Sequence, residues 1–176
     1  MGTIPGAARV LTMVKRLRDN QSWSGETHLQ KAMFFLDRET GGSTNFDFVL
    51  YKHGPYSFDL HDTLATLSAL CLIENQPVPP YGPRINLTES GERFLKQHDD
   101  VGVEELRRID SVAGWFGNKG VAELERLATA LWVQDRGTGK DEICLAEEIH
   151  KIKPHISNED ALAALREVAL FRSPGA

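Results

Sequence analysis

The sequence predicts a mainly α-helical protein with a small β element, an α+β chain built from two modules, residues 1–98 and 99–176. Two observations predict this class. Apolar residues recur at helical spacing over most of the chain. Strand-like patterns are short and occur only in the first module, whereas helical patterns alone follow residues 99–102, which are the predicted boundary.

The first elements follow from hydrophobic spacing and from boundary residues. A helix is expected over residues 7–20 and a second over 27–40, where Thr27 and Gln30 match a capping box. Residues 45–51 alternate apolar and polar side chains, which indicates a short strand. Residues 52–56 contain a Gly-Pro pair and are predicted to form a turn.

Residues 57–95 give the strongest fold signal. Ser57 is expected to cap a helix, strands are expected over residues 72–78 and 84–87 around a proline-rich loop, and Thr88 then caps a helix that ends near residue 98. This order resembles the wing of a winged helix-turn-helix domain, so the first module is predicted to be winged-helix-like. The helix is expected to bury Leu60, Leu64, Leu67 and Cys71.

The second module is predicted to be helical throughout. Breaks at Gly117-Asn118, at residues 136–139 and at Pro154 separate its helical patterns, and Ser157 is expected to cap the last helix. Both cysteines, Cys71 and Cys144, are predicted to be small buried hydrophobic residues without a disulfide. The expected helices cover residues 103–116, 121–134, 142–153 and 158–171.

Composition limits the function classes. Hydrophobic residues make up 41% of the 176 residues, enough to bury a core, and no apolar run approaches the length of about 18–20 residues that spans a bilayer. The first residues do not match a secretion signal, so a cytoplasmic, bacterial setting without membrane contact is expected. Residues 1–98 are neutral and the net charge of −5 lies in the second module, which disfavours a nonspecific nucleic-acid binder.

The helix that would read DNA has the wrong side chains. A major-groove reader uses Arg, Lys, Asn or Gln. Residues 41–56 also separate the two helices, whereas a helix-turn-helix joins them by three or four residues. DNA binding by this helix is therefore disfavoured. Its outward face consists of Asp59, His61, Asp62, Ala65, Thr66 and Ala69.

The patterns at residues 29–36, 46–57, 124–132 and 152–157 resemble the uncharacterised YwgA-like family of bacterial proteins. Lys31 on a helix, followed by Gly54-Pro55 before another helix, is more distantly similar to the Panacea domain of SocA-like antitoxins. The first resemblance implies no activity. The second implies a partner-binding protein from a toxin–antitoxin or phage-related setting, and neither implies a catalytic residue.

Two segments are candidate binding sites. The turn at residues 51–57 concentrates functional side chains and precedes a helix N-terminus that could receive an anion, although the same residues also suit a purely structural turn. The proline-stiffened wing tip presents two residue types that favour interfaces, or it protects an exposed strand edge. The candidate binding residues are Tyr51, His53, Tyr56, Ser57, Tyr81 and Arg84.

Catalytic, metal and cofactor sites are not expected. Glu147 and His150 form a single Glu-x-x-His pair where a di-iron bundle needs two. His98 with Asp99 and Asp100 is better interpreted as a solvated helix end. Residues 137–140 lack the complete phosphate-loop pattern, and no nucleophile motif surrounds a serine or cysteine.

The sequence therefore predicts a non-enzymatic, protein-binding regulatory or antitoxin-like factor on a winged-helix-like scaffold. Its partner could be encoded by a neighbouring gene, and a homodimer through the helical module is a further expectation. One alternative is a winged-helix transcriptional regulator that contacts DNA through Lys15, Arg16, Arg18 and the wing. The other alternative is an enzyme with a site that sequence patterns do not identify.

Overall fold

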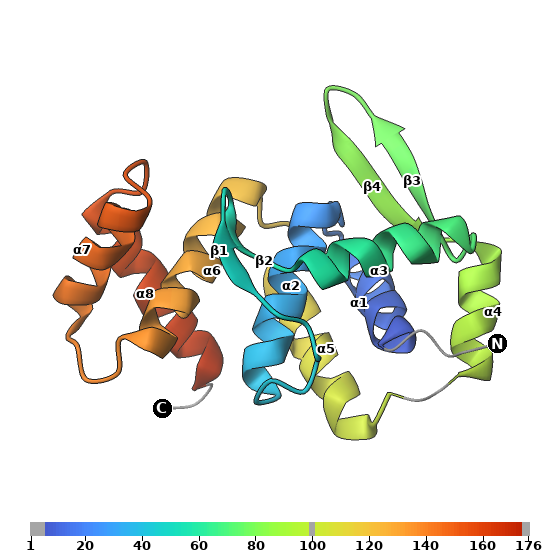
Figure 1. The fold of residues 1–176 in the computed structure, drawn as a ribbon, viewed down its shortest axis with the longest axis horizontal. Helices are drawn as coiled ribbons and strands as arrows, with labels where there is room; N and C mark the ends of the chain where they lie inside the picture. The colour runs from blue at the N-terminus through green and yellow to red at the C-terminus, as the bar shows by residue number, and fades with distance from the viewer. Residues whose placement is uncertain (1–5, 99–100, 174–176) are drawn as a thin grey trace.

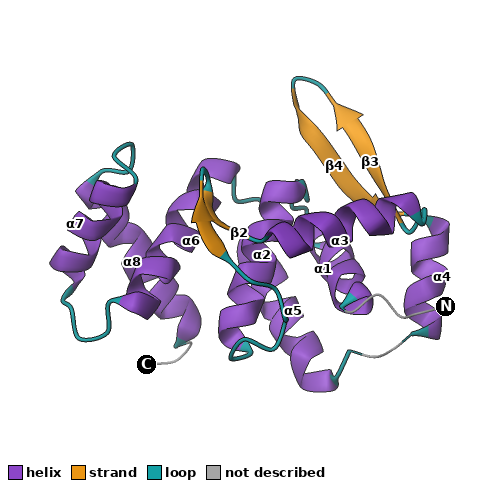
Figure 2. Ribbon diagram, viewed as in Figure 1, coloured by secondary structure: helices purple, strands orange, loops and turns teal. Residues whose placement is uncertain are grey.

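The structure is a computed structural model that describes residues 6–98 and 101–173. It confirms a mostly helical α+β fold with two small antiparallel hairpins (Figures 1 and 2). The elements, in chain order, are α1 (Ala7–Asp19), α2 (Glu26–Glu39), β1 (Val49–Tyr51), β2 (Gly54–Tyr56), α3 (Phe58–Ala69), β3 (Ile73–Val78), β4 (Tyr81–Leu87), α4 (Glu89–Gln97), α5 (Val103–Phe116), α6 (Val121–Arg136), α7 (Glu142–Ile152) and α8 (Asn158–Arg172).

Helix α2 lies at the centre of the fold, where α1, α5, α6 and β2 pack against it. Every residue from His28 to Asp37 is buried. Phe34 and Phe35 supply much of this contact, with ring centroids 6.0 Å from Trp132 and 5.6 Å from Phe116, respectively. A helix surrounded on all sides has no solvent face, so its polar side chains must find partners inside the protein.

The predicted capping box at the start of α2 is wrong. The helix begins at Glu26 with Gly25 as its N-cap, and no side chain caps it. Gln30 instead exchanges two hydrogen bonds with the backbone of Ser57: its amide donates to the carbonyl oxygen at 2.9 Å, and its own oxygen accepts from the N–H at 2.8 Å. The side chain is therefore used to attach the start of α3 to α2, a contact that helix-boundary rules do not consider.

The segment predicted as a strand and a turn is a hairpin. Phe46 and Phe48 are buried as the alternation predicts, but only Val49–Tyr51 form β1, and Gly54–Tyr56 form β2 where a turn was expected. Gly54 has φ +85°, and a Cβ atom there would lie 3.1 Å from Thr129 Oγ1 on α6. The Gly-Pro pair thus allows the hairpin to press its backbone against α2 and α6.

The predicted order of helix, hairpin and helix is present in α3, β3–β4 and α4. Ser57 Oγ accepts from the Leu60 N–H, and Thr88 Oγ1 accepts from the Gly91 N–H, so both predicted caps are confirmed. The second strand starts at Tyr81, three residues before the predicted start, because Val78 and Tyr81 close the hairpin tightly. The hairpin β3–β4 projects beyond the helices (Figure 1). That this arrangement is a winged helix stays a prediction.

Both cysteines are exposed, which contradicts the prediction that they are buried. Helix α3 ends at Ala69, and Cys71 adopts φ +56°, which turns its side chain out of the helical row. Leu72, 9% exposed, is buried in its place. Cys144 lies in the first turn of α7, whose buried face is formed by Leu145, Ala146 and Ile149.

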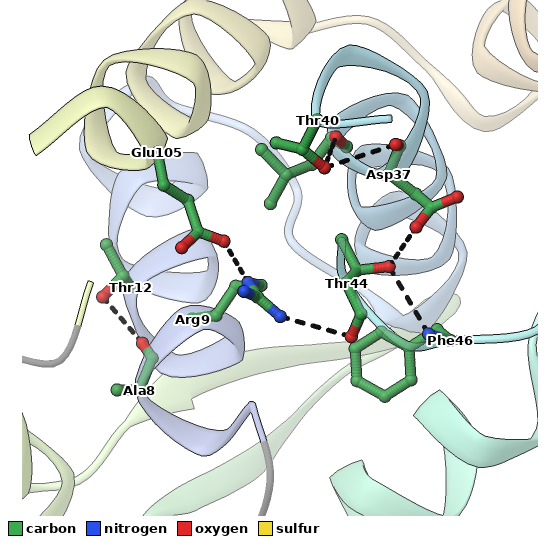
Figure 3. A network of polar contacts seen from close by, with 9 residues as sticks. Ala8, Arg9, Thr12, Asp37, Thr40, Thr44, Phe46 and Glu105 are labelled. Carbon is green, nitrogen blue, oxygen red and sulfur yellow. Dashed lines mark hydrogen bonds and ion pairs between the residues drawn. The ribbon is translucent and has the colours of Figure 1, made fainter. Parts of the chain in front are cut away.

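The four predicted helices of the second half are confirmed as α5 to α8, with ends that differ by at most two residues, and Ser157 caps α8. Figure 3 shows how α5 joins the first half: Arg9 of α1 pairs with Glu105 of α5 and donates to the carbonyl of Thr44, whose hydroxyl donates to Asp37 of α2. The described residues of both halves contribute to one hydrophobic cluster.

The predicted boundary includes Asp99 and Asp100, which lie outside the described residues, so a division at residue 98 stays a prediction. Within the described ranges, no helix combines the length and the apolar character needed to cross a membrane.

Candidate functional site

Two neighbouring hollows are the candidate sites. The larger, which we call the wing groove, has a volume of about 1220 Å³ and lies between the β3–β4 hairpin and α3. The smaller, the Lys31 pocket, has about 260 Å³ and lies between the β1–β2 hairpin and the start of α2. Glu26 and Thr27, in the first turn of α2, line both.

The tip of the wing groove is an aromatic and cationic cluster around Trp23. The Tyr81 ring meets the Trp23 ring edge-to-face at 5.2 Å, and the Arg84 guanidinium lies 4.1 Å from the Trp23 centroid. Trp23 Nε1 also donates to the carbonyl of Gly82 at 3.1 Å. The structure therefore brings the two predicted wing residues together, but through a tryptophan that sequence patterns did not single out. Tyr81 lines the groove and stays 68% exposed.

The opposite wall of the wing groove is made of small side chains. Ala65, Ser68 and Ala69 of α3 face the groove beside Leu64, while Ile73 and Ile85 line it from the hairpin. These small residues follow one another at the spacing of one helical face. Because they reach little beyond the backbone, they leave depth for bulky side chains of a ligand.

His28 lies at the base of the wing groove, beside the loop that precedes α6. It is 3% exposed, and among the described residues neither ring nitrogen has a hydrogen-bond partner. Burial lowers the pKa of His28, and a contact with the backbone of Lys119 opposes this shift only in part. The imidazole is therefore neutral near pH 7.

Glu26 stands between the two hollows. One of its oxygens accepts from the Tyr56 hydroxyl at 2.9 Å and lies 2.8 Å from His61 Nδ1. The hydrogen bond to Glu26 raises the pKa of His61, and burial together with Glu26 raises the pKa of Tyr56 to about 12. Tyr56 thus donates its hydroxyl hydrogen to Glu26 and does not ionise near neutral pH.

The Lys31 pocket is built around a buried lysine. Lys31 is 1% exposed, and its Nζ donates to the carbonyl of Pro55 in β2 at 2.9 Å. Burial lowers its pKa to about 8, with Glu125 opposing and Lys153 adding to the shift. The remaining wall comes from Tyr51, Lys52, His53, Gly54 and Tyr56 of the hairpin.

Behind the hairpin, the carboxylate of Glu125 in α6 lies close to one ammonium group and two imidazole rings. One carboxylate oxygen lies 3.5 Å from Lys153 Nζ and 3.3 Å from His155 Nε2, and the other lies 3.7 Å from His53 Nδ1. Lys153 also donates to the carbonyls of Tyr51 and Lys52. Glu125 and Lys153 are both 7% exposed, so this cluster fixes the hairpin from inside the protein.

The predicted binding residues divide between the two sites. Tyr51, His53 and Tyr56 line the Lys31 pocket, and Tyr81 lines the wing groove. Ser57 is buried as the cap of α3 and faces neither hollow, and Arg84 lies against Trp23. Lys31, Glu125, His28 and Trp23 complete the sites. A lysine within the apolar stretch at residues 29–36 was the only sequence signal for any of them.

The cations that could contact DNA are engaged within the protein. Lys15 Nζ lies 2.6 Å from Glu92, Arg16 Nε lies 2.7 Å from Asp110, and Arg18 donates to the carbonyl of Ser22. Over the described residues, no group of three or more His, Cys, Asp or Glu side chains is placed to hold a metal ion. The solvated helix end predicted at His98, Asp99 and Asp100 falls partly outside the described residues, which include His98 as the C-cap of α4 but neither aspartate.

Neither the known protein-family models nor the curated proteins include a match to this chain. The resemblance to the YwgA-like family and to the Panacea domain therefore stays a prediction.

Proposed function

We propose that the chain is a non-enzymatic, protein-binding factor that receives a segment of a partner protein in the wing groove. The main support is the groove itself, which has a volume of about 1220 Å³ and lies between an aromatic hairpin tip and a wall of small side chains. Pockets for small molecules usually have about 300–1000 Å³, so the groove suits a stretch of polypeptide better.

The lining supports an apolar helix or strand with basic flanking residues as the occupant. Bulky side chains of a partner can enter above Ala65 and Ala69, as in other helix-in-groove complexes. Glu26, in the first turn of α2, lines the groove, and Asp59 and Asp62 lie on the first two turns of α3 without lining it. A basic residue beside the apolar segment would pair with them, which favours correct partners and faster association.

A regulatory or antitoxin-like role is part of this proposal. It depends on the resemblance through Lys31 and Gly54-Pro55, and the wing groove supports only the binding step. The rival is sequence-specific DNA binding. The partly exposed ion pairs of Lys15 with Glu92 and of Arg16 with Asp110 compete with phosphate for these cations, which disfavours this rival.

The experiment compares two tryptophan substitutions on α3. Ala69→Trp fills the groove, whereas Thr66→Trp changes an exposed residue of the same helix outside it. In pull-downs from the source cell, we expect a specific partner to be recovered with the wild type and Thr66→Trp and to be lost at least about tenfold with Ala69→Trp, since bulk in the groove blocks docking. Equal recovery with both variants, or no specific partner at all, contradicts the proposal.

A DNA titration on the same three proteins separates the rival. Binding of promoter DNA that weakens steeply with salt and is unchanged in Ala69→Trp would support a DNA-binding regulator.

A further inference from the structure

Lys31 places an ammonium group inside the protein at the wall of an open pocket. Buried charges in proteins are normally paired with a charge of opposite sign. Among the described residues, however, Lys31 forms no ion pair, and its ammonium group donates a hydrogen bond to the neutral carbonyl oxygen of Pro55. Glu125, the buried carboxylate on the adjacent helix, pairs with Lys153, His155 and His53 instead.

The charges around the pocket leave a positive excess. Two buried ammonium groups, Lys31 and Lys153, lie beside one buried carboxylate, Glu125, and Glu26 in the pocket wall is the second carboxylate near them. Lys52 stands at the mouth of the pocket and adds a further positive charge. The lowered pKa of Lys31, about 8, has burial as its main cause, which is the expected consequence of a charge without a close counter-ion. The group remains mostly cationic at neutral pH.

The geometry also limits which anion fits. An ammonium group uses up to three donors, and Lys31 uses one for Pro55. The hydroxyl-bearing side chains of Thr27 and Tyr51 stand in the same wall. Glu26 lies there too, and it repels a doubly charged phosphate more strongly than a singly charged carboxylate. No arginine lines the pocket among the described residues, so the bidentate fork that often holds phosphate is missing.

We propose that the Lys31 pocket binds a carboxylate group, which the Lys31 ammonium holds between the β1–β2 hairpin and the first turn of α2. The volume of about 260 Å³ admits a small acid or one acidic side chain. The carboxylate could belong to a free acid or to a polypeptide, and the chemistry of recognition is the same. The proposal does not depend on the wing groove, because a different set of residues holds the ligand.

The test follows Lys31 itself by NMR in full-length protein labelled with ¹³C at the lysine ε carbon. Sodium acetate is the probe, and sodium chloride at equal ionic strength is the control. Lys31→Met and Lys31→Arg both remove the Lys31 signal and so assign it. We expect acetate to move this signal saturably and to raise the pKa of Lys31 by about one unit or more, because acetate then binds the ammonium form about tenfold more tightly than the amine.

Lys96→Met is the matched control, since it removes an exposed cation of α4 that lines neither hollow and leaves Lys31 in place. Acetate should still move the Lys31 signal in this variant with an affinity within about threefold of the wild type, because surface charges are screened. An unchanged Lys31 signal in acetate, an equal change in chloride, or complete loss of the effect in Lys96→Met overturns the proposal.

A second set of ligands identifies the source of the carboxylate. Propionate and N-acetyl-glutamate amide carry the same charge, and only the second has the flanking amides of a polypeptide. Tighter binding of the capped glutamate assigns the pocket to an acidic side chain of a protein, and equal or tighter binding of propionate assigns it to a free acid. Phosphate should bind more weakly than either, and tighter binding of phosphate would overturn the choice of a carboxylate.

Discussion

Replacing Glu125 by glutamine should destabilise the protein through Lys153. The substitution keeps the size of the side chain but removes the one carboxylate that, among residues 6–98 and 101–173, lies within ion-pair distance of that buried ammonium, at 3.5 Å. Removing one partner of a buried ion pair costs about 3–5 kcal/mol. Lys153 retains the carbonyl oxygens of Tyr51 and Lys52 as acceptors, so we expect a loss at the lower end, about 3 kcal/mol.

The assay is urea unfolding at neutral pH, followed by circular dichroism, with thermal unfolding as a second measure. For a chain of this length, a loss of about 3 kcal/mol corresponds to a decrease in Tm of about 6–12 °C. Lys153→Met in the Glu125→Gln background should restore part of the loss, because it removes the uncompensated charge.

Glu123→Gln is the control on the same helix. Glu123 is 3.9 Å from Lys119 and its side chain is 40% exposed, so its loss should change stability by no more than about 0.5 kcal/mol. The reasoning is refuted if Glu125→Gln is as stable as the wild type, or if it matches Glu123→Gln.

Two further predictions concern a buried histidine and a glycine contact. Burial lowers the pKa of His28 below 6.5, so the unfolded chain takes up a proton before the folded protein does as pH falls. The free energy of unfolding should therefore decrease below about pH 6.5 down to the folded pKa. His28→Gln should reduce this pH dependence in urea titrations between about pH 7.5 and about pH 5.5. A variant with the wild-type slope would contradict this. Gly91→Ala should lower the free energy of unfolding by about 2–3 kcal/mol or more in the same assay, because its Cβ would lie 2.1 Å from the Leu72 carbonyl oxygen. The control Gly102→Ala, whose Cβ would have no atom within 4 Å, should change it by no more than about 1 kcal/mol. Equal losses in the two variants would refute the contact argument.

The parts of the fold that could be predicted depend on local physics. Helix ends at Ser57, Thr88 and Ser157 are set by a side chain that bonds to a backbone group three residues away, so the sequence alone indicates them. The strand β2 could not be found in this way. Its three residues include Gly54 and Pro55, which are poor strand formers, and it exists because β1 pairs with it and α6 leaves room only for a glycine.

Residues of the candidate sites could be predicted only where the residue type and its position in the sequence were sufficient, without knowledge of partners distant in the chain. Tyr81 and Tyr51 were identified by residue type and by their position in loops, and each lines a hollow. Glu125 was not identified, because its partners His53 and Lys153 are distant in the chain and no spacing rule connects them. The same is true of Trp23, which meets Tyr81 only after the hairpin has formed.

Both hollows depend on residues from the second half of the chain. Lys153 holds the carbonyls of Tyr51 and Lys52, so the wall of the Lys31 pocket is fixed from the loop that follows α7. Lys119 and Val121, from the loop before α6 and its first turn, line the wing groove beside His28. Residues 1–98 thus contain most of the binding side chains but not the contacts that complete their geometry. Ligand binding at either site should consequently be measured on the whole chain, because a fragment that ends at residue 98 would lack part of one site and the support of the other.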